Sequence, residues 1–378
     1  MKKIYFIIIL VLGFCSCQKE ISHEIASPAE VDVYVAGYVF DGTNAFATYW
    51  KNGSLVSLTS GGGATSFAGA NSIAVVGSDV YVAGGEGGVA KYWKNGSPVI
   101  LNDGSKWGWS TSIAVSGNDV YVAGYLGNVP GNVPGDYNAH AVYWKNGNAT
   151  YLPENTRSGD WADNYPISST SSGANSIFIS GSDIYIAGGE EITRMISPYP
   201  NLGVASAISA VYWKNGNEIY LIKGGYGGSL ADDAYSIFVA EQDVYACGAL
   251  EARYWKNGAS VYLPGITTAK SIFVSEGDVY VAGTQPDGQP FQTYNGTRYR
   301  TVAKYWKNGN PVSLSDGTKD AYATSIAVSG TDIYVAGYEE KTAGAQDYIA
   351  KYWKNGNPVI LGDVSKESET YSIVLAKK

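Results

Sequence analysis

The sequence predicts an all-β protein: a closed seven-bladed β-propeller of four-stranded blades, in which the C-terminal strand completes the first blade. Three short strand-like blocks each occur seven times between residues 31 and 378. The second block recurs on average every 50 residues from Asp32 to Asp332, and this period suits a propeller blade. The chain also holds 47 Gly and 31 Tyr but 2 Met, a composition that disfavours helices and favours strands.

The first two strands of each blade are predicted to form a hairpin, because a tight Gly-x-Asp turn joins their blocks. The inner block is Ser-Ile-(Ala/Phe/Val)-(Val/Ile/Leu), which begins at Ser72, Ser112, Ser176, Ser236, Ser271, Ser325 and Ser372. The second is Asp-(Val/Ile)-Tyr-x-(Ala/Cys)-Gly, which begins at Asp32, Asp79, Asp119, Asp183, Asp243, Asp278 and Asp332. Near-continuous apolar runs such as residues 80–83 predict strands that neighbouring blades cover on both faces.

The third strand of each blade ends in Tyr-Trp-Lys-Asn-Gly, with Trp50, Trp93, Trp144, Trp213, Trp255, Trp306 and Trp353. Asn-Gly supplies the two positive-φ positions of a type I′ turn, so a fourth strand follows at once. Pro98, Pro311 and Pro358 begin that strand, where an outermost strand tolerates a residue without a backbone donor. Each blade therefore runs outward from an inner strand.

The two ends of the chain predict how the ring closes. The first blade begins at Asp32 with its second strand, whereas residues 370–375 (TYSIVL) form an inner strand with no second strand after it. Seven complete blades result if this last strand joins the first blade. Such closure removes the two open sheet edges that would otherwise invite aggregation.

The repeats resemble bacterial propeller repeats of cell-surface and secreted proteins over residues 31–378. They lack the Gly-His and Trp-Asp pairs of WD40 blades, and the double glycine of kelch blades occurs only at Gly84-Gly85 and Gly188-Gly189. The resemblance implies a propeller. It matches no family of known activity, so it transfers no functional residue to this chain.

The N-terminus predicts a targeting signal. Lys2 and Lys3 precede an apolar run over residues 4–14, which is shorter than the ~20 residues that span a bilayer. The following Cys15-Ser16-Cys17 resembles the lipobox of Gram-negative lipoproteins. We expect a signal peptide over residues 1–17 with Cys17 acylated, a polar tether over 18–30 and the propeller over 31–378. The resemblance implies a lipid anchor in the cell envelope, at the outer membrane or cell surface. Acylation of Cys15 and an unlipidated secreted protein stay open.

The composition excludes several classes of function. A net charge of −8 without a basic cluster argues against nucleic-acid binding. With 3 Cys and 2 His, the chain lacks the ligands for a disulfide scaffold or a Cys- or His-based metal site. It contains no HExxH, GxSxG, P-loop or calcium-loop motif. We expect no cofactor and no metal.

Residues that recur in every blade are predicted to be structural. Asp119 and its six equivalents are expected to cap the inner turn by hydrogen bonds to the backbone, in preference to a ring of carboxylates around a cation. The repeated Trp residues are expected to fill the space between blades, in preference to stacking on sugars. Cys247 replaces a small Ala in the second block and is expected to be an unreactive core thiol.

Function is expected where the blades differ. The connections from the second to the third strand, and those between blades, share one face and vary most in length. Residues 126–140, 153–175, 190–209 and 284–302 are the longest such stretches, and the first three belong to consecutive blades. Aromatic rings beside carboxylates and Arg suit a saccharide, although the rings can also be hydrophobic plugs for the loops. The candidate ligand-binding residues are Trp107, Trp109, Tyr137, Asp160, Trp161, Asp163, Tyr165, Arg194 and Tyr199.

Three functions remain open from the sequence. The first is a non-catalytic lipoprotein that binds a glycan or an envelope protein through the loops. The second is a structural scaffold of the envelope without a small ligand. The third is a carboxylate-dependent glycan-active enzyme, for which Asp160 with Asp163, or Glu190 with Glu191, is a candidate pair.

Overall fold

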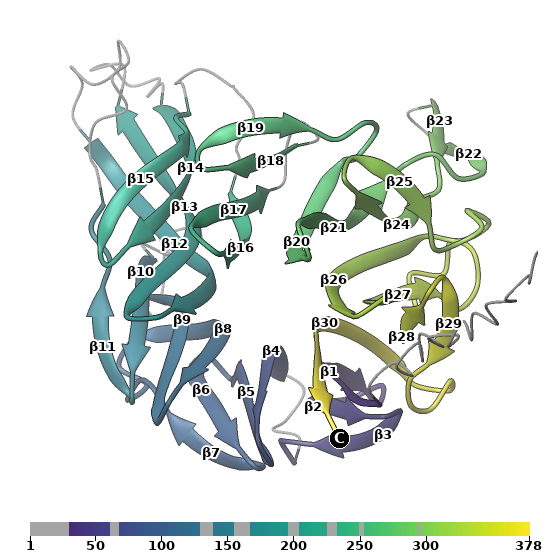
Figure 1. The fold of residues 1–378 in the computed structure, drawn as a ribbon, viewed down its shortest axis with the longest axis horizontal. Helices are drawn as coiled ribbons and strands as arrows, with labels where there is room; N and C mark the ends of the chain where they lie inside the picture. Colours follow the sequence, from purple (N-terminus) through teal and green to yellow (C-terminus); the bar gives the residue numbers. More distant parts are fainter. Residues whose placement is uncertain are drawn as a thin grey trace, which may run out of the picture.

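The computed structural model describes residues 30–60, 68–128, 139–154, 167–195, 204–224, 233–248, 253–293 and 296–378. Seven four-stranded antiparallel sheets lie around a central axis (Figure 1). Within the described residues every regular element is a strand. The predicted seven-bladed propeller is therefore confirmed.

The strands follow the predicted order in each blade, from the innermost to the outermost. Blade 1 consists of β30 (Glu367–Lys377), β1 (Val31–Phe40), β2 (Ala45–Lys51) and β3 (Ser54–Ser57). Blade 2 consists of β4 (Ala68–Val76), β5 (Asp79–Glu86), β6 (Val89–Lys94) and β7 (Ser97–Ile100). Blade 3 consists of β8 (Trp107–Ser116), β9 (Asp119–Gly127), β10 (His140–Lys145) and β11 (Asn148–Tyr151).

The remaining blades have the same order, with one insertion. Blade 4 consists of β12 (Ile167–Ser180), β13 (Asp183–Met195), β14 (Val204–Lys214) and β15 (Asn217–Ile222). Blade 5 consists of β16 (Ala234–Ala240), β17 (Asp243–Gly248), β18 (Arg253–Lys256) and β19 (Ala259–Tyr262). Blade 6 consists of β20 (Thr268–Ser275), β21 (Asp278–Gln285), β24 (Val302–Lys307) and β25 (Asn310–Ser313), with the inserted hairpin β22 (Pro290–Thr293) and β23 (Gly296–Tyr299). Blade 7 consists of β26 (Ala321–Ser329), β27 (Asp332–Glu340), β28 (Tyr348–Lys354) and β29 (Asn357–Ile360).

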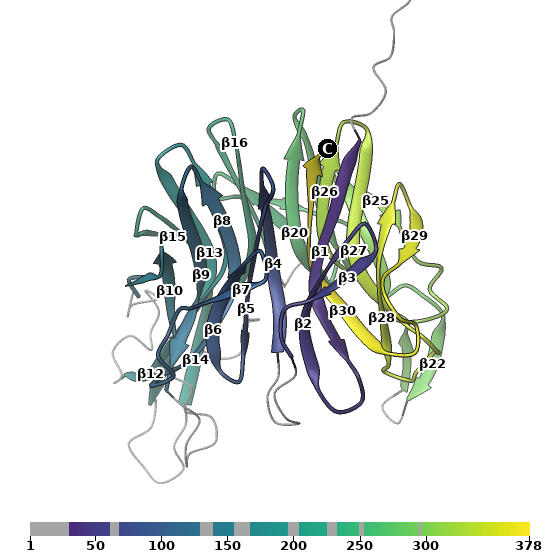
Figure 2. The same cartoon turned by 90° about the horizontal axis from the view of Figure 1, so that it is seen from below.

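The ring has two different faces (Figure 2). The inner hairpin turns and the Asn-Gly turns lie together on one face, which we call the turn face. The connections from the second to the third strand and those between blades lie on the opposite face, which we call the loop face. This separation follows from antiparallel pairing throughout every blade.

The ring closes through the C-terminal strand, as predicted. Strand β30 pairs antiparallel with β1 from Glu367 to Lys377. The backbone N–H of Lys378 donates to the carbonyl of Glu30 at 3.1 Å, and the side chains of the same two residues form an ion pair at 2.9 Å. The two ends of the propeller are thus neighbours in blade 1.

A circle of hydrogen bonds links the inner strands. In each blade the backbone N–H of the Ile in the Ser-Ile block donates to the Ser hydroxyl of the preceding blade, for example Ile113 to Ser72 at 3.2 Å. All seven bonds are present, at 3.1–3.4 Å. The last joins Ile73 to Ser372 and so bridges the first and last inner strands. The repeated Ser is therefore explained as a link between blades.

The core lies between the blades. The seven repeated Trp side chains are at most 1% exposed, and each belongs to a hydrophobic cluster shared by two blades. This confirms the predicted packing role. Cys247 is fully buried in the cluster of Trp306, and burial raises the pKa of its thiol. A buried neutral thiol is a poor nucleophile, as expected for a structural Cys.

The repeated Asp has a different role from the predicted backbone cap. Asp79 accepts a hydrogen bond from the Asn95 side chain at 2.8 Å and pairs with Lys94 at 2.9 Å. Asn95 in turn accepts the backbone N–H of Val80. The same Asp–Lys ion pair occurs in all seven blades, so these carboxylates tie the two turns of each blade together.

The Asn-Gly turns adopt the predicted conformation. Their Asn residues have φ between +49° and +52°, and their Gly residues between +78° and +85°. Two successive positive φ angles identify type I′ turns. The turn face is therefore a repeated surface of satisfied polar clusters.

Candidate functional site

Two positions on each inner strand vary from blade to blade, although the residues around them are nearly constant. The strand reads variable–Ala–variable–Ser–Ile, with Ser or Thr in place of Ala twice. A β-bulge leaves the second variable residue without a cross-strand partner in every blade. We call the first the rim position, occupied by Gly69, Trp109, Gly173, Asp233, Thr268, Tyr322 and Glu369. We call the second the bulge position, occupied by Asn71, Thr111, Asn175, Tyr235, Lys270, Thr324 and Tyr371.

The bulge explains the constant Gly of the second block. In blade 2 a Cβ on Gly84 would overlap the carbonyl oxygen of Gly69 at the rim position. The equivalent overlap occurs in all seven blades, at Gly37, Gly84, Gly124, Gly188, Gly248, Gly283 and Gly337. The constant residues therefore give all seven blades the same backbone conformation. The rim and bulge positions then carry side chains that differ from blade to blade.

The first cavity, which we call the acidic cavity, lies on the loop face between blades 4 and 5. It has a volume of about 230 Å³ and is lined by Ser171, Ser172, Gly173, Gly189, Glu190, Glu191, Ile208, Asp233 and Tyr235. Asp233 comes from the rim position of blade 5 and Tyr235 from its bulge. A Cβ on Gly189 would overlap Asp233 Oδ1, so the carboxyl group of Asp233 lies directly on the backbone of blade 4.

Asp233 experiences both burial and the charges of its neighbours. Burial is the largest cause of a raised pKa for Asp233; the charge of Glu191 raises it further, and that of Lys270 partly offsets both. Lys270 holds its ammonium group 3.9 Å from the centre of the Tyr235 ring. Burial also lowers the pKa of Lys270. A carboxyl that retains its proton beside a second carboxyl group can act as a general acid.

A second polar cluster supports the wall of the acidic cavity from behind. Glu190 is 2% exposed and accepts the Tyr220 hydroxyl at 3.0 Å. Burial and a hydrogen bond with Glu190 raise the pKa of Glu218 to about 8. On the blade 3 side, Ser172 donates to Glu154 at 2.5 Å, and His140 lies 2.8 Å from the same carboxylate oxygen. These contacts fix the wall from which Glu191 extends.

The second cavity, which we call the aromatic cavity, lies on the loop face at blades 1 to 3. It has a volume of about 480 Å³ and is lined by Asn71, Gly87, Gly88, Trp107, Trp109, Tyr125 and Tyr371. The rings of Trp107 and Trp109 are nearly parallel, 15° apart with centroids at 6.4 Å. Tyr125 lies 5.6 Å from Trp107. All three rings are partly exposed.

One wall of the aromatic cavity leads to a pair of carboxyl groups. Tyr371 donates to Glu369 at 3.1 Å, and its ring stacks on Tyr38 at 6.1 Å. Tyr38 donates to Glu367 at 3.3 Å. Burial is the main cause of a raised pKa for Glu369. This wall is therefore acidic and rich in hydroxyl groups.

The double glycines at the end of the second block, Gly84-Gly85 and Gly188-Gly189, mark the two cavities. A Cβ on Gly85 would overlap the Trp109 ring, much as one on Gly189 would overlap Asp233. In both cases the rim side chain of one blade lies across the second Gly of the preceding blade. The double glycine is therefore a packing device in this chain.

The structure places some of the predicted ligand-binding residues. Trp107 and Trp109 line the aromatic cavity. Arg194 is 4% exposed within β13, opposite Ala205 of β14. The other candidates lie outside the described residues: Tyr137, Asp160, Trp161, Asp163, Tyr165 and Tyr199.

Sequence reasoning missed Asp233, Tyr235, Glu369 and Tyr371. Tyr235, Glu369 and Tyr371 lie inside repeated strands, and Asp233 immediately precedes one. The sequence does contain a pattern that could have identified them, since these four residues occupy positions that vary from blade to blade beside a constant Ser-Ile pair.

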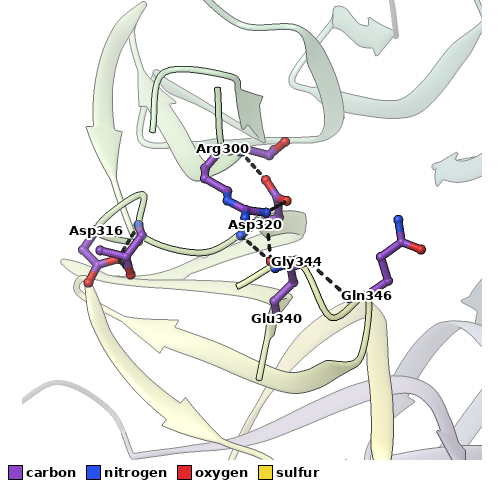
Figure 3. A network of polar contacts seen from close by, with 8 residues as sticks. Arg300, Asp316, Asp320, Glu340, Gly344 and Gln346 are labelled. Atoms are coloured by element: carbon purple, nitrogen blue, oxygen red, sulfur yellow. Dashed lines mark hydrogen bonds and ion pairs between the residues drawn. The ribbon is translucent and has the colours of Figure 1, made fainter. Parts of the chain in front are cut away.

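The long connection of blade 6 forms a structural lock (Figure 3). Arg300 donates to Asp320 at 2.9 Å and to Glu340 at 3.4 Å, and its guanidinium lies 4.3 Å from the Phe291 ring centre. Glu340 is 1% exposed and also accepts the backbone N–H groups of Asp320, Gly344 and Gln346. The buried charges of Arg300 and Glu340 both have partners, and these contacts hold the connection of blade 6 against blade 7.

Two kinds of feature are absent from the described residues. In these ranges no group of three or more His, Cys, Asp or Glu side chains is arranged to hold a metal ion. Nor does the described part of the chain include a helix with the length and apolarity to cross a membrane.

The chain matches no protein-family model and no curated protein. Similar solved structures include a Trypanosoma rangeli sialidase in complex with the inhibitor DANA, with 12% identity, a TM-score of 0.40, and coverage of 75% of this chain and 54% of that chain. An exo-1,5-α-L-arabinanase from a bovine ruminal metagenomic library has 9% identity, a TM-score of 0.32, and coverage of 69% and 99%. A GH43 endo-arabinanase from Bacillus licheniformis has 13% identity, a TM-score of 0.29, and coverage of 66% and 96%. The chain spans about half the length of the sialidase, and this likeness concerns the propeller fold alone.

The prediction of a non-catalytic binding module is corrected. The similar solved structures are named as a sialidase and arabinanases, which are glycan-active enzymes. Because they share only the fold with this chain, its chemistry has to come from its own cavities. Three acidic residues, Glu190, Glu191 and Asp233, line the acidic cavity, and the first two are one of the candidate pairs of the enzyme alternative.

Proposed function

We propose that the protein is a glycan-active enzyme that cleaves a glycosidic bond with the carboxyl groups of the acidic cavity. One observation carries the proposal: Asp233 and Glu191 line one cavity, and the pKa of Asp233 is raised by burial and by Glu191. Glycosidases require an acid that protonates the leaving oxygen and a second carboxylate that activates water or attacks the sugar.

The residues divide these tasks by their surroundings. Asp233, buried against Gly189, retains the proton and gives it to the departing glycosidic oxygen. Glu191 is the second carboxylate, which takes a proton from the attacking water or bonds to the anomeric carbon. Tyr235 offers a ring face for the apolar side of a sugar. The cavity of about 230 Å³ has room for one sugar ring.

The test is glycan cleavage by purified residues 30–378 on a panel of neutral and acidic polysaccharides, followed by reducing-end release. We expect Asp233→Asn and Glu191→Gln to lower kcat by about 10²–10⁴-fold, the usual contribution of general acid–base groups. Asp363→Asn is the matched control, since the exposed carboxylate of Asp363 accepts hydrogen bonds from Ser365 in a turn far from the cavity lining. No cleavage by the wild type, or full activity of Asp233→Asn, contradicts the proposal.

The pH profile provides a second test. Because Asp233 must be protonated and its pKa is raised, activity should fall on the alkaline side as this group loses its proton. Substitution of Lys270 by Met removes the positive charge that lowers the pKa of Asp233. We therefore expect Lys270→Met to move the alkaline limb to higher pH.

We further propose that this activity is anchored to the cell envelope. The lipobox-like Cys15-Ser16-Cys17 supports the proposal, although these residues lie outside the described ranges. Labelling with a clickable fatty acid in a Gram-negative host tests it. Incorporation that Cys17→Ser abolishes is expected, and incorporation that persists in this variant contradicts Cys17 as the acylated residue.

A further inference from the structure

The aromatic cavity has the shape and chemistry of a sugar-binding surface. Trp107 and Trp109 offer nearly parallel, partly exposed faces, and Tyr125 extends them. The apolar face of a sugar ring packs on such a platform. The cavity of about 480 Å³ has room for more than one ring.

Backbone contacts hold the two Trp rings in place. A Cβ on Gly85 would overlap the Trp109 ring, and one on Gly88 would overlap that of Trp107. Each ring therefore lies flat against the backbone of blade 2. A ring fixed in this way loses little conformational entropy when a ligand binds.

The edge of the cavity favours a neutral sugar. The Asn71 amide donates one N–H to the carbonyl of Ser110 at 2.8 Å, and its oxygen can accept a sugar hydroxyl. The Tyr371 hydroxyl is bonded to Glu369. The described lining includes no Lys or Arg, so nothing there offsets the negative charge of a sugar acid.

Among the described residues, the rim position between the two cavities carries a glycine. Trp109, Gly173 and Asp233 occupy the rim positions of blades 3, 4 and 5, so the rim position between the other two belongs to Gly173. A Cβ built on Gly173 meets only Asn175 Oδ1 at 3.9 Å, and Gly173 also lines the acidic cavity. The inner strands of blades 3 and 4 are joined directly, since Thr111 donates to the carbonyl of Ala174 at 2.6 Å.

We infer that one glycan chain occupies both cavities: its cleaved bond lies at Asp233, it passes over Gly173, and a neutral sugar several units away stacks on Trp109. Because Trp109 and Asp233 are two blade steps apart along the ring, we expect an oligosaccharide rather than a disaccharide to reach both. This inference rests on the proposed function for the cleavage site, but the sugar-binding platform can be tested without turnover.

The first experiment compares kcat/KM for a neutral hexasaccharide and the matching disaccharide. We expect the wild type to prefer the hexasaccharide, and Trp109→Ala to reduce this preference by roughly tenfold, the effect of losing one stacking contact. Gly173→Leu should reduce it as well, because the added side chain blocks the path. Tyr262→Ala is the matched control, since Tyr262 is 69% exposed on the outer strand β19 and lies on neither cavity.

The second experiment separates this inference from the proposed function. Hexasaccharide binding to the Asp233→Asn protein is measured by calorimetry, with and without Trp109→Ala. Binding that depends on Trp109 while the wild type shows no cleavage would support the platform and refute the enzyme. Unchanged affinity and unchanged length preference in both Trp109→Ala and Gly173→Leu would overturn the inference, provided that circular dichroism shows both variants folded.

Discussion

Side-chain volumes at the level of single residues are matched across neighbouring blades. Where the second strand carries Gly85, the next rim residue is Trp109, and the same match pairs Gly189 with Asp233. Protein interiors are close-packed, so a large residue on one side requires space on the other. A functional side chain can therefore be exchanged here only together with its neighbour.

Glu218 should make stability depend on pH. Its pKa is about 8, raised by burial and by a hydrogen bond with Glu190, against 4.5 for a free Glu. Because the folded pKa is higher, its stabilising contribution is present below pH ~4.5 and is lost as the pH rises towards ~8. We expect Glu218→Gln to flatten the melting temperature between about pH 5 and pH 8. Asp103→Asn is the control, because the pKa of Asp103 is lowered by Ser105; an equal effect in both variants contradicts the assignment.

Glu241 should be replaceable with a gain in stability. It has φ of +55° at the inner turn of blade 5, where four other blades have Gly at +57° to +60°. The left-handed conformation costs a residue with a Cβ roughly 1–2 kcal/mol. We expect Glu241→Gly to raise the free energy of unfolding in urea by about 1 kcal/mol. The reverse change at the same turn of blade 4, Gly181→Ala, should lower the free energy of unfolding. A loss of stability in Glu241→Gly would show that the positive φ of Glu241 is not strained.

The inner strand is the element on which both architecture and the candidate site depend. Its Ser-Ile pair makes the hydrogen bonds between blades, and its bulge leaves one residue per blade outside the sheet pairing. A β-bulge redirects side chains without ending the strand. The bulge position can therefore carry a different side chain in each blade, while the backbone conformation of the inner strand stays the same.

Two glycines of this architecture should respond in opposite ways to Ala. A Cβ on Gly84 would overlap the carbonyl oxygen of Gly69, whereas one on Gly173 has only an ordinary contact with Asn175 at 3.9 Å. We expect Gly84→Ala to lower the free energy of unfolding by about 1–3 kcal/mol, as overpacking does, and Gly173→Ala to leave it nearly unchanged. Urea unfolding followed by Trp fluorescence measures both. Equal stability of the two variants would show that the bulge is not the reason for the constant Gly.

The whole molecule depends on a closed ring, since every blade has two neighbours and no sheet face is left open. Strand β30 supplies the inner strand of blade 1, and the ends of the propeller meet at Glu30 and Lys378. Without β30, the edge of β1 would expose unpaired backbone groups, which promotes aggregation.

Closure can be tested by moving the last strand. A permuted chain that begins at Glu367, links Lys378 to Glu30 and ends at Lys366 keeps every strand in place, so we expect a folded monomer that melts within a few degrees of the wild type. A chain of residues 30–366 lacks β30 and should aggregate in size-exclusion chromatography. If that truncated chain stays monomeric with an unchanged melting temperature, the ring does not need the last strand for its stability.

The sequence by itself determined the blade number, the strand order, the type I′ turns and the closing strand. These features depend on local signals such as Asn-Gly turns and on a repeat period, which act without knowledge of distant contacts. It also marked the repeated Trp residues as core. The partners of the repeated Asp were not predictable, because Asn95 and Lys94 approach Asp79 only once the third strand lies beside the second.

Only the tertiary structure decided where chemistry can occur. Packing of consecutive blades brings Asp233 and Glu191 to one cavity. Ring closure brings Trp109 and Tyr371, which are far apart in the sequence, to the other. Function was predicted in the long loops, whereas residues at the rim and bulge positions of the inner strands contribute to the lining of both cavities. The raised pKa of Asp233 likewise arises from burial against Gly189 of the preceding blade, an environment that forms only when the blades pack together.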